Sequence, residues 1–159
     1  MRDVPTVRSF EAFCTNEADR LARALAIALN NRELGRDAAA EALTRAWPRW
    51  AEISEYDNPA GWVYRVGLNW GRSRLRRWRR ETITEVFAEV TEPAPDPDGA
   101  IADALRKLST EHRAVVVGRI YLDWSEADLA IALGIPTGTV KSRLSRALAQ
   151  LEQHLGASS

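Results

Sequence analysis

Six arginines lie within residues 69–80, and no acidic residue lies among them. On a helix they cover most of the circumference, so no single row of salt bridges can pair them all. Such a block repels itself, and contact with a polyanion relieves this repulsion and releases counterions. Trp70 and Trp78 lie among the arginines, and aromatic rings stack on unpaired bases. The block therefore indicates nucleic-acid binding; the alternative is a solvated helix end, where cations also suit the helix dipole.

Residues 124–146 predict a helix-turn-helix. Ser125, with Asp128 three residues later, forms a capping box, and Gly134 is placed to end the first helix in a left-handed conformation. The second helix carries short hydroxyl and long cationic side chains near its start, namely Thr137 (its expected cap), Thr139, Lys141, Ser142, Arg143 and Arg146. Such a helix fits a major groove, where the hydroxyls and Lys141 reach base edges and Arg143 and Arg146 reach phosphates. A merely solvated polar face is the alternative.

Net charge is uninformative for this chain because two opposite blocks cancel. The 159 residues have a formal charge of +0 and a pI of about 6.8, yet the arginine block is followed by six acids and no base in residues 81–100. Cys14 is the sole cysteine and cannot form an internal disulfide. Together with the lack of a signal-peptide pattern, it favours a cytoplasmic location. No apolar run reaches the length of a membrane span, so membrane insertion is not expected.

The sequence offers no recognisable catalytic or metal-binding arrangement. It lacks a glycine-rich phosphate loop, a nucleophile elbow and a metal-ligand cluster, and His112 and His154 are isolated in the chain. We therefore expect no enzymatic activity, no cofactor, no metal and no small-molecule substrate.

The elements that must position the two cationic surfaces are all expected to be helical. Apolar periodicity predicts helices over residues 10–29, 37–50 and 60–80. Asp37 is the expected cap of the second helix, and Pro48 is expected to kink or end it. Asn58 and Pro59 provide a cap and first turn for the third. Trp47, Trp50 and Trp62 are expected in the core.

An acidic, proline-rich linker over residues 81–99 divides the chain. Its TEPAPDPDG stretch holds no apolar residue larger than alanine and cannot enter a core. The predicted fold class is all-α, with an N-terminal module of three to four helices (1–80) and a C-terminal helix-turn-helix module (100–159). In the latter, Ser109 caps a helix, and the final helix is expected to bury Val140, Leu144, Leu148, Leu151 and Leu155. Whether this acidic linker folds onto the arginine block is left open by the sequence.

Two sets of motifs together resemble the bacterial sigma factors of the extracytoplasmic-function (ECF) group, within the sigma-70 family. Sigma factors direct RNA polymerase core to promoters. The N-terminal matches are RDAAAEALTRAWPRW (36–50) and NPAGWVYRVGLNWGRSRLRR (58–77). The C-terminal matches are ALRKLSTEHRAVVV (104–117) and LAIALGIPTGTVKSRLSRAL (129–148). They cover both conserved regions in the family's order, whereas GTVKSRLSRA alone would also suit response-regulator DNA-binding domains.

The resemblance implies a role for each surface. Residues 1–80 would be a region 2-like domain that binds polymerase core and opens the −10 element, and residues 100–159 a region 4-like domain that reads the −35 duplex. Core binding is implied for Asp37, Glu41, Trp47 and Trp50. Binding of −10 DNA is implied for Tyr56, Asp57, Asn58, Asn69, Trp70, Arg72, Arg76, Arg77 and Arg80, and −35 binding for the helix-turn-helix residues named above. The implied partners are RNA polymerase core (clamp and flap), promoter DNA and an anti-sigma factor.

The chain departs from the family's pattern at a few positions. Ala40 stands where a glutamine is usual on the clamp-binding helix, and Ser73 replaces a frequent aspartate. Two other functions remain open at this stage. One is a stand-alone helix-turn-helix regulator of duplex operators, which leaves the arginine block unexplained; the other is an interaction protein such as a polymerase-sequestering decoy.

Overall fold

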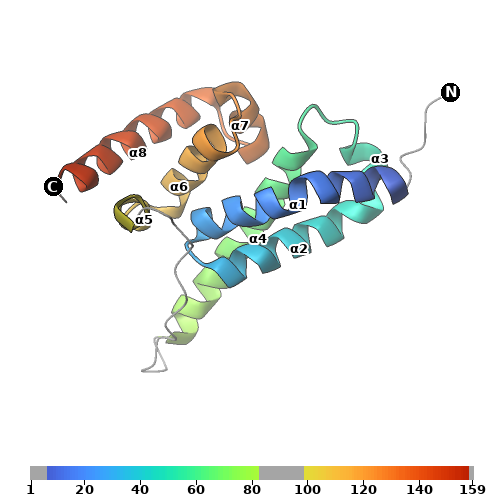
Figure 1. The fold of residues 1–159 in the computed structure, drawn as a ribbon, viewed down its shortest axis with the longest axis horizontal. Helices are drawn as coiled ribbons and strands as arrows, with labels where there is room; N and C mark the ends of the chain where they lie inside the picture. Colours follow the sequence, from blue (N-terminus) through green and yellow to red (C-terminus); the bar gives the residue numbers. More distant parts are fainter. Residues whose placement is uncertain (1–6, 83–98, 158–159) are drawn as a thin grey trace.

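The computed structural model describes residues 7–82 and 99–157, and all regular secondary structure in these ranges is helical (Figure 1). In chain order the elements are α1 (Val7–Leu29), α2 (Arg32–Ala46), the 3₁₀ turn η1 (Trp47–Arg49), α3 (Trp50–Ile53), α4 (Pro59–Thr82), α5 (Gly99–Arg106), α6 (Thr110–Val116), the π-helical turn η2 (Val117–Tyr121), α7 (Glu126–Leu133) and α8 (Thr137–Ala157). The prediction of an all-α chain with two helical modules is confirmed. The linker lies outside the described residues from Ile83 to Asp98.

The N-terminal module is built on α1, α2 and α4, which pack together along their lengths. Leu21 and Leu25 of α1 are fully buried against Val63 and Tyr64 of α4 in one core. Gly35 allows α2 to approach α1 closely, because a Cβ at this position would lie 2.4 Å from the backbone nitrogen of Ala26.

The start of α2 differs from the prediction. Asn31, not Asp37, is the cap: its Oδ1 accepts a hydrogen bond from the Leu34 amide at 3.0 Å. Both residue types cap helices well, so local sequence does not choose between them. Packing decides between the two caps, because the extra first turn of α2 buries Leu34 and Gly35 against α1.

The tryptophans divide between core and surface. Trp50 is 5% exposed and its ring meets Phe10 and Phe13, at centroid distances of 5.2 Å and 4.8 Å. The core prediction holds for Trp50 but is wrong for Trp47, which is 46% exposed. The reason is that α2 ends at Ala46, and Pro48 turns the chain through η1 so that the Trp47 ring contacts Phe10 from the surface. Trp62 is half-buried, under the guanidinium of Arg49.

The predicted caps of the C-terminal module are mostly confirmed. Ser109 Oγ accepts from the His112 amide at 3.2 Å, Ser125 Oγ accepts from the Asp128 amide at 3.0 Å, and Gly134 has a φ of 67°. The Thr137 cap is wrong, because Thr137 is already the first residue of α8 and the Pro136 carbonyl accepts the amides of residues 139 and 140.

The buried stripe of α8 also needs correction at two positions. Val140, Leu144 and Ala147 are buried, whereas Leu148 and Leu155 are 42% and 39% exposed. A spacing of four residues drifts round a 3.6-residue helix, so the second step along the stripe falls on Ala147 rather than Leu148.

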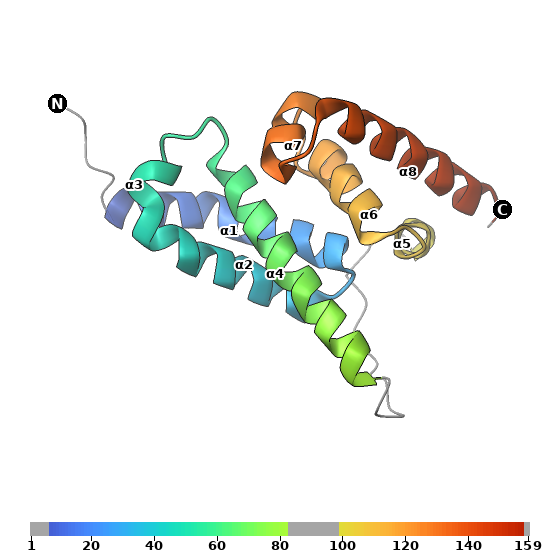
Figure 2. The same cartoon turned by 180° about the vertical axis from the view of Figure 1, so that it is seen from behind.

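The two modules pack directly on one another and share a core. Ala114, Val117 and Leu122 of the C-terminal module belong to the same buried cluster as Leu21 and Leu25. Helix α4 packs on α7, and α1 packs on α6 and η2 (Figure 2). The surfaces that the modules bury in this seam are therefore fixed relative to each other in the structure.

Candidate nucleic-acid interface

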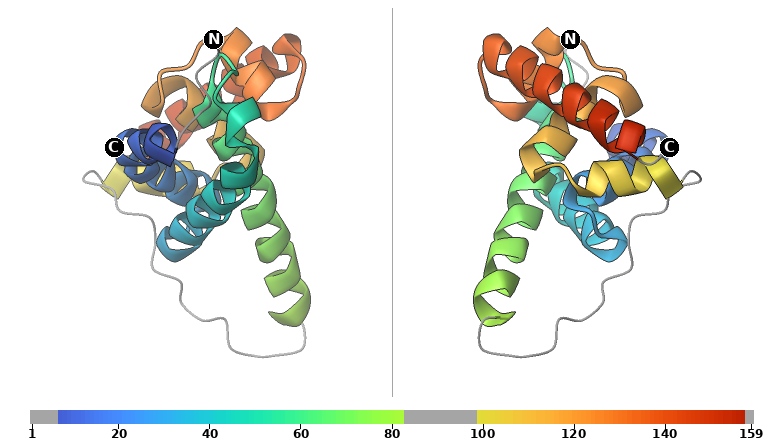
Figure 3. Two further views of the ribbon diagram at one scale, coloured as in Figure 1. Left: turned by 90° about the vertical axis from the view of Figure 1, so that its right-hand side faces the viewer. Right: turned by 90° about the vertical axis from the view of Figure 1, so that its left-hand side faces the viewer.

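Helix α4 has two halves with different surroundings. Its first half is buried, with Val63 and Tyr64 fully covered and Leu68 4% exposed. Its last turns extend beyond the other helices, as the side views show (Figure 3). Arg76, Arg77, Arg79 and Arg80 are all exposed there. A packed helix thus carries a projecting cationic end.

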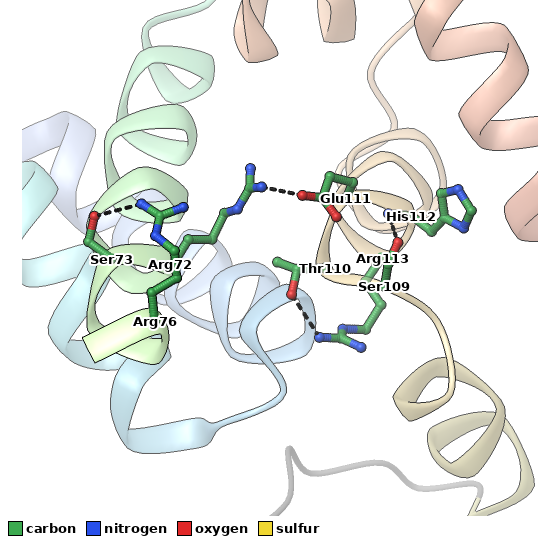
Figure 4. A network of polar contacts seen from close by, with 8 residues as sticks. All are labelled: Arg72, Ser73, Arg76, Ser109, Thr110, Glu111, His112 and Arg113. Carbon is green, nitrogen blue, oxygen red and sulfur yellow. Dashed lines mark hydrogen bonds and ion pairs between the residues drawn. The ribbon is translucent and has the colours of Figure 1, made fainter. Parts of the chain in front are cut away.

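Local contacts orient the side chains of this projecting end. The guanidinium of Arg74 lies 4.9 Å from the centroid of the Trp70 ring, a cation–π contact that fixes both side chains. Arg76 Nη2 donates to Ser73 Oγ at 3.2 Å (Figure 4). Ser73 is thus a neutral partner, so this bond leaves the charge of Arg76 in place.

The loop before α4 holds its polar residues in fixed positions. The Tyr56 hydroxyl donates to Glu52 Oε1 at 2.6 Å. This bond raises the pKa of Tyr56, and, together with Arg49, it lowers the pKa of Glu52. Asn58 Oδ1 accepts from the Gly61 amide at 3.1 Å and so caps α4 as predicted. The ring of Tyr56 and the carboxylate of Asp57 are exposed on this loop.

Helix α8 presents most of its predicted polar residues away from its buried stripe. Thr137, Lys141, Ser142 and Arg146 are exposed, while Thr139 and Arg143 are half-buried. Ser142 Oγ donates to the Thr139 carbonyl at 3.1 Å, so it lies close to the helix surface. The first turns of α8 can therefore enter a groove without rearrangement of the helix itself.

A small polar cleft of about 180 Å³ lies in the seam between α4 and the C-terminal module. Glu111 of α6 forms an ion pair with Arg72 across it (Figure 4). Its own backbone amide, Arg72 and Arg143 all lower the pKa of Glu111 against the effect of burial. Asn69 and Arg72 of the predicted −10 set and Arg143 of the predicted −35 set line this one cleft. The two sets thus meet at the seam.

Buried polar contacts hold the other side of the seam. Arg113 of α6 is 7% exposed; its Nε donates to the Ala28 carbonyl at 2.9 Å and its Nη1 to the Leu108 carbonyl. Burial lowers the pKa of this guanidinium. The Tyr64 hydroxyl, fully buried, donates to the Ala114 carbonyl at 2.9 Å. Helix ends and turns of each module are therefore completed by side chains of the other.

Comparison with known proteins decides the family. A model described as sigma-70, region 4 matches residues 98–151. The ECF RNA polymerase sigma factor SigL of Mycobacterium tuberculosis is 38% identical over an alignment of 133 residues, and the match covers 76% of this chain and 75% of SigL. The RNA polymerase sigma-E factor of Streptomyces coelicolor is 31% identical over an alignment of 157 residues, and the match covers 94% of this chain and 87% of the relative. The chain belongs to the ECF sigma factors.

Solved structures agree with this membership. The ECF sigma factor resembles RpoE in the complex of RpoE with the anti-sigma factor NepR from Bartonella quintana, with a TM-score of 0.80 and 25% identity over 96% of this chain and 100% of that one. It also resembles CnrH in its complex with the cytosolic domain of CnrY, with a TM-score of 0.68 and 27% identity over 97% of this chain and 92% of that one.

The sigma factor carries most of its predicted site residues on accessible surfaces. Asp37, Trp47, Asp57, Asn69, Arg76, Arg77 and Arg80 are exposed, and Glu41, Asn58, Trp70 and Arg72 are half-buried. Trp50 differs, because its ring lies in the core. In the described part of the sigma factor, no cluster of three or more His, Cys, Asp or Glu residues could hold a metal, and no helix is long and apolar enough to cross a membrane.

Sequence reasoning missed the residues that join the modules. Arg65 and Glu111 line the polar cleft, and Tyr64 and Arg113 bond to remote carbonyls. Arg143, which was predicted for −35 binding alone, lines the same cleft. One indication of these contacts was present in the sequence: Arg113 directly precedes the apolar run 114–117, and a charged residue beside such a run is seldom buried unless it is paired.

Proposed function

We propose that this sigma factor binds RNA polymerase core and directs promoter-specific initiation, reading the −35 duplex with α8 and capturing −10 DNA with α4 and the loop before it. One observation carries the proposal: a single chain holds two exposed cationic surfaces of different kinds on separate modules. The start of α8 suits a duplex groove, whereas the arginines and Trp70 of α4 suit an unpaired strand.

The −10 assignment follows from the chemistry of strand capture. A base removed from the duplex needs an aromatic or apolar surface and hydrogen-bonding groups at its edge. Tyr56 and Asp57 offer an exposed ring and carboxylate on a loop that Glu52 and the Asn58 cap hold in place. Behind them, the arginines of α4 provide cations for the backbone of the strand.

Core docking is assigned to the outer face of α2 and the turn after it. Asp37, Glu41 and Trp47 lie there at least partly accessible, and Ala40 is exposed between the two acids. Arg45 donates to Glu41 at 3.0 Å, which holds that carboxylate in place. Trp50 supports the turn from within the core rather than by contacting polymerase. The short Ala40 side chain leaves docking to its charged and aromatic neighbours.

Promoter binding requires the modules to separate. Elements numbered −35 and −10 lie roughly 25 base pairs, or about 85 Å, apart along B-DNA. A compact chain of 159 residues has a radius of gyration of only about 15 Å. In the closed arrangement Asn69, Arg72 and Arg143 share one cleft, so they cannot face two separated elements. The described structure thus corresponds to a form that opens before or during promoter binding.

An anti-sigma factor is the proposed regulatory partner. The neighbour RpoE was solved with the anti-sigma factor NepR, and the closed arrangement of this chain gives a partner a defined conformation to hold.

The test is to mix the purified full-length chain with bacterial RNA polymerase core and to measure complex formation and run-off transcription from the DNA upstream of its own gene. Core association with specific initiation is the expected result. Substitution of Trp47 by alanine should weaken core association, whereas substitution of the exposed Ile131 should not. Duplex binding without core association would contradict the proposal, and so would core association without initiation.

A further inference from the structure

A chain of polar contacts leads from the first turns of α4 to the hydroxyl of Tyr56, on the loop between α3 and α4 (Figure 1). The guanidinium of Arg49, in η1, lies 5.6 Å from the centroid of the Trp62 ring on α4. Arg49 Nη2 donates to both carboxylate oxygens of Glu52 at 3.2 Å, and Glu52 Oε1 accepts from the Tyr56 hydroxyl at 2.6 Å. The tip of the Tyr56 side chain is therefore tied to both α3 and α4.

The backbone that carries Tyr56 is held from the core. Trp50 and Ile53 of α3 are both buried in the N-terminal module. The Tyr56 amide donates to the Ile53 carbonyl at 3.0 Å, so the backbone at Tyr56 continues from this buried turn. The ring itself stays 38% exposed. A surface tyrosine ordinarily samples several rotamers, whereas this one is held at both ends while its ring remains accessible to a ligand.

Glu52 is an unexpected residue beside a surface assigned to a nucleic acid, because a carboxylate repels phosphates. Its pairing with Arg49 cancels this charge. The hydrogen bond from Tyr56 and the contact with Arg49 lower the pKa of Glu52, so the carboxylate stays ionised at neutral pH. An ionised acceptor binds a hydroxyl more strongly than a neutral one does. The Arg49–Glu52 pair therefore holds the Tyr56 hydroxyl firmly and adds no net charge.

The held hydroxyl leaves the ring of Tyr56 as the group that meets a ligand. A tyrosine hydroxyl has one proton, and here it is donated to Glu52 rather than to the edge of a base. The aromatic face remains free for this purpose, and such a face stacks on any unpaired base. Ordering a mobile side chain during binding lowers affinity, and a side chain that is already ordered avoids this loss.

We propose that Arg49 and Glu52 are positioning residues for strand capture, which hold the Tyr56 ring, through its hydroxyl, in an orientation that stacks on an unpaired base. Neither residue needs to contact DNA for this role. The inference rests on the proposed function, because it explains how Tyr56 acts in −10 binding. Loss of the pair should weaken capture about threefold to tenfold, which corresponds to the ordering of one side chain.

The first test keeps the net charge constant. The double variant Arg49→Ala, Glu52→Ala removes one cation and one anion, and the full-length chain is reconstituted with RNA polymerase core. Fluorescence anisotropy with a labelled single strand, from the −10 region upstream of its own gene, should show affinity reduced about threefold to tenfold. Asp103→Ala with Arg106→Ala is the matched control, because this exposed pair on α5 has the same i,i+3 spacing. Wild-type affinity in the Arg49, Glu52 variant would overturn the proposal.

A double-mutant cycle shows whether the pair acts through Tyr56. Tyr56→Phe keeps the ring and removes the hydroxyl, so it should lose as much affinity as the loss of the pair, and the combination should lose no more. Glu52→Gln keeps an oxygen acceptor for the hydroxyl and should lose less than Glu52→Ala. On a strand with an abasic site in place of the stacked base, wild type and variants should bind equally. Additive losses, or equal losses on every abasic strand, would contradict a role through the Tyr56 ring.

Two further measurements separate this inference from the proposed function. The bond to Glu52 raises the pKa of Tyr56, so NMR of ring-labelled tyrosine should show Tyr56 titrating at higher pH in the wild type than in Glu52→Ala. Identical titrations would overturn the positioning role without any use of DNA. Run-off transcription tests the function: initiation by the wild type, with strand capture unchanged in the Arg49, Glu52 variant, would overturn the positioning role alone. A wild type that neither captures the strand nor initiates would overturn the proposed function and the positioning role together.

Discussion

The seam between the modules and the projecting end of α4 use arginine in opposite ways. At the seam, Arg113 is 7% exposed and donates to the carbonyls of Ala28 and Leu108. At the projecting end, Arg76 and Arg77 are exposed, and the bond that Arg76 makes to Ser73 lies at the helix surface. A desolvated guanidinium is costly to leave unpaired, whereas a solvated one remains available to a ligand. Arg113 at the seam should therefore govern stability, and the exposed Arg76 and Arg77 should govern nucleic-acid affinity.

The largest effect is expected at Arg113. Arg113→Leu removes the buried donors and leaves the carbonyls of Ala28 and Leu108 without them, which should lower the free energy of unfolding by about 3 kcal/mol. Urea unfolding followed by tryptophan fluorescence measures it. Arg119→Leu is the matched control, because Arg119 is exposed and, within the described residues, forms an ion pair with Asp123 at 3.8 Å. Equal losses in the two variants would show that the seam contributes no more than the surface.

The opposite outcome is expected at the projecting end. Arg76→Ala with Arg77→Ala should leave the unfolding free energy within about 0.5 kcal/mol of the wild type. If both residues contact phosphates, the slope of log affinity for a single-stranded −10 oligonucleotide against log salt should fall by about 1.4. Lys107→Ala with Arg119→Ala removes two exposed charges from the C-terminal module and serves as control. An unchanged slope in the α4 variant would remove these arginines from the strand-binding surface.

The seam and the projecting end also differ in how well the sequence predicted them. The arginine block and the caps at Ser109 and Ser125 are local features, so spacing alone located them correctly. Arg113 and Tyr64 bond to carbonyls 85 and 50 residues away in the chain, and a backbone carbonyl has no residue type to recognise. The seam could therefore not be predicted from residue patterns.

The errors within single helices have the same origin. Asn31 and Asp37 are both good caps, and the contact of Gly35 with the backbone of α1 decides between them. Leu148 has the residue type of a buried position, yet Ala147 lies on the face that meets the rest of the module. Tertiary packing selects among options that local sequence leaves nearly equal.

A smaller loss is expected from the second buried contact of the seam. Tyr64→Phe keeps the ring against Trp124 and removes only the hydroxyl that donates to Ala114, so the unfolding free energy should fall by about 1–1.5 kcal/mol. Burial also raises the pKa of Tyr64. Its contribution is thus complete below the unfolded pKa of about 10 and declines as pH rises above it.

The alkaline side of the stability–pH curve provides a check on the hydrogen bond from Tyr64 to Ala114. Between pH 9 and 11 the wild type should lose stability more steeply than Tyr64→Phe, which has no proton to release at this site. Tyr56→Phe, which removes an exposed hydroxyl bonded to Glu52, should leave the unfolding free energy at pH 7 close to that of the wild type. If the unfolding free energies of wild type and Tyr64→Phe fell equally with pH over this range, the Tyr64 hydroxyl would be in contact with water.

The smallest effect is expected at Arg72, which lies on α4 and also takes part in the seam. Arg72 belongs to α4 but pairs with Glu111 across the seam, with both side chains more than a third exposed, so the pair should contribute only about 0.5 kcal/mol. A double-mutant cycle of Arg72→Gln and Glu111→Gln at pH 7 measures it. Because the pKa of Glu111 is lowered in the folded state, this contribution is present above its unfolded pKa and is lost as pH falls. The coupling energy should therefore fall as pH drops below the unfolded value of about 4.3 and vanish at pH values below the folded pKa. A coupling that persists there, or that exceeds the loss in Arg113→Leu, would make the ion pair rather than the buried guanidinium the main bond of the seam.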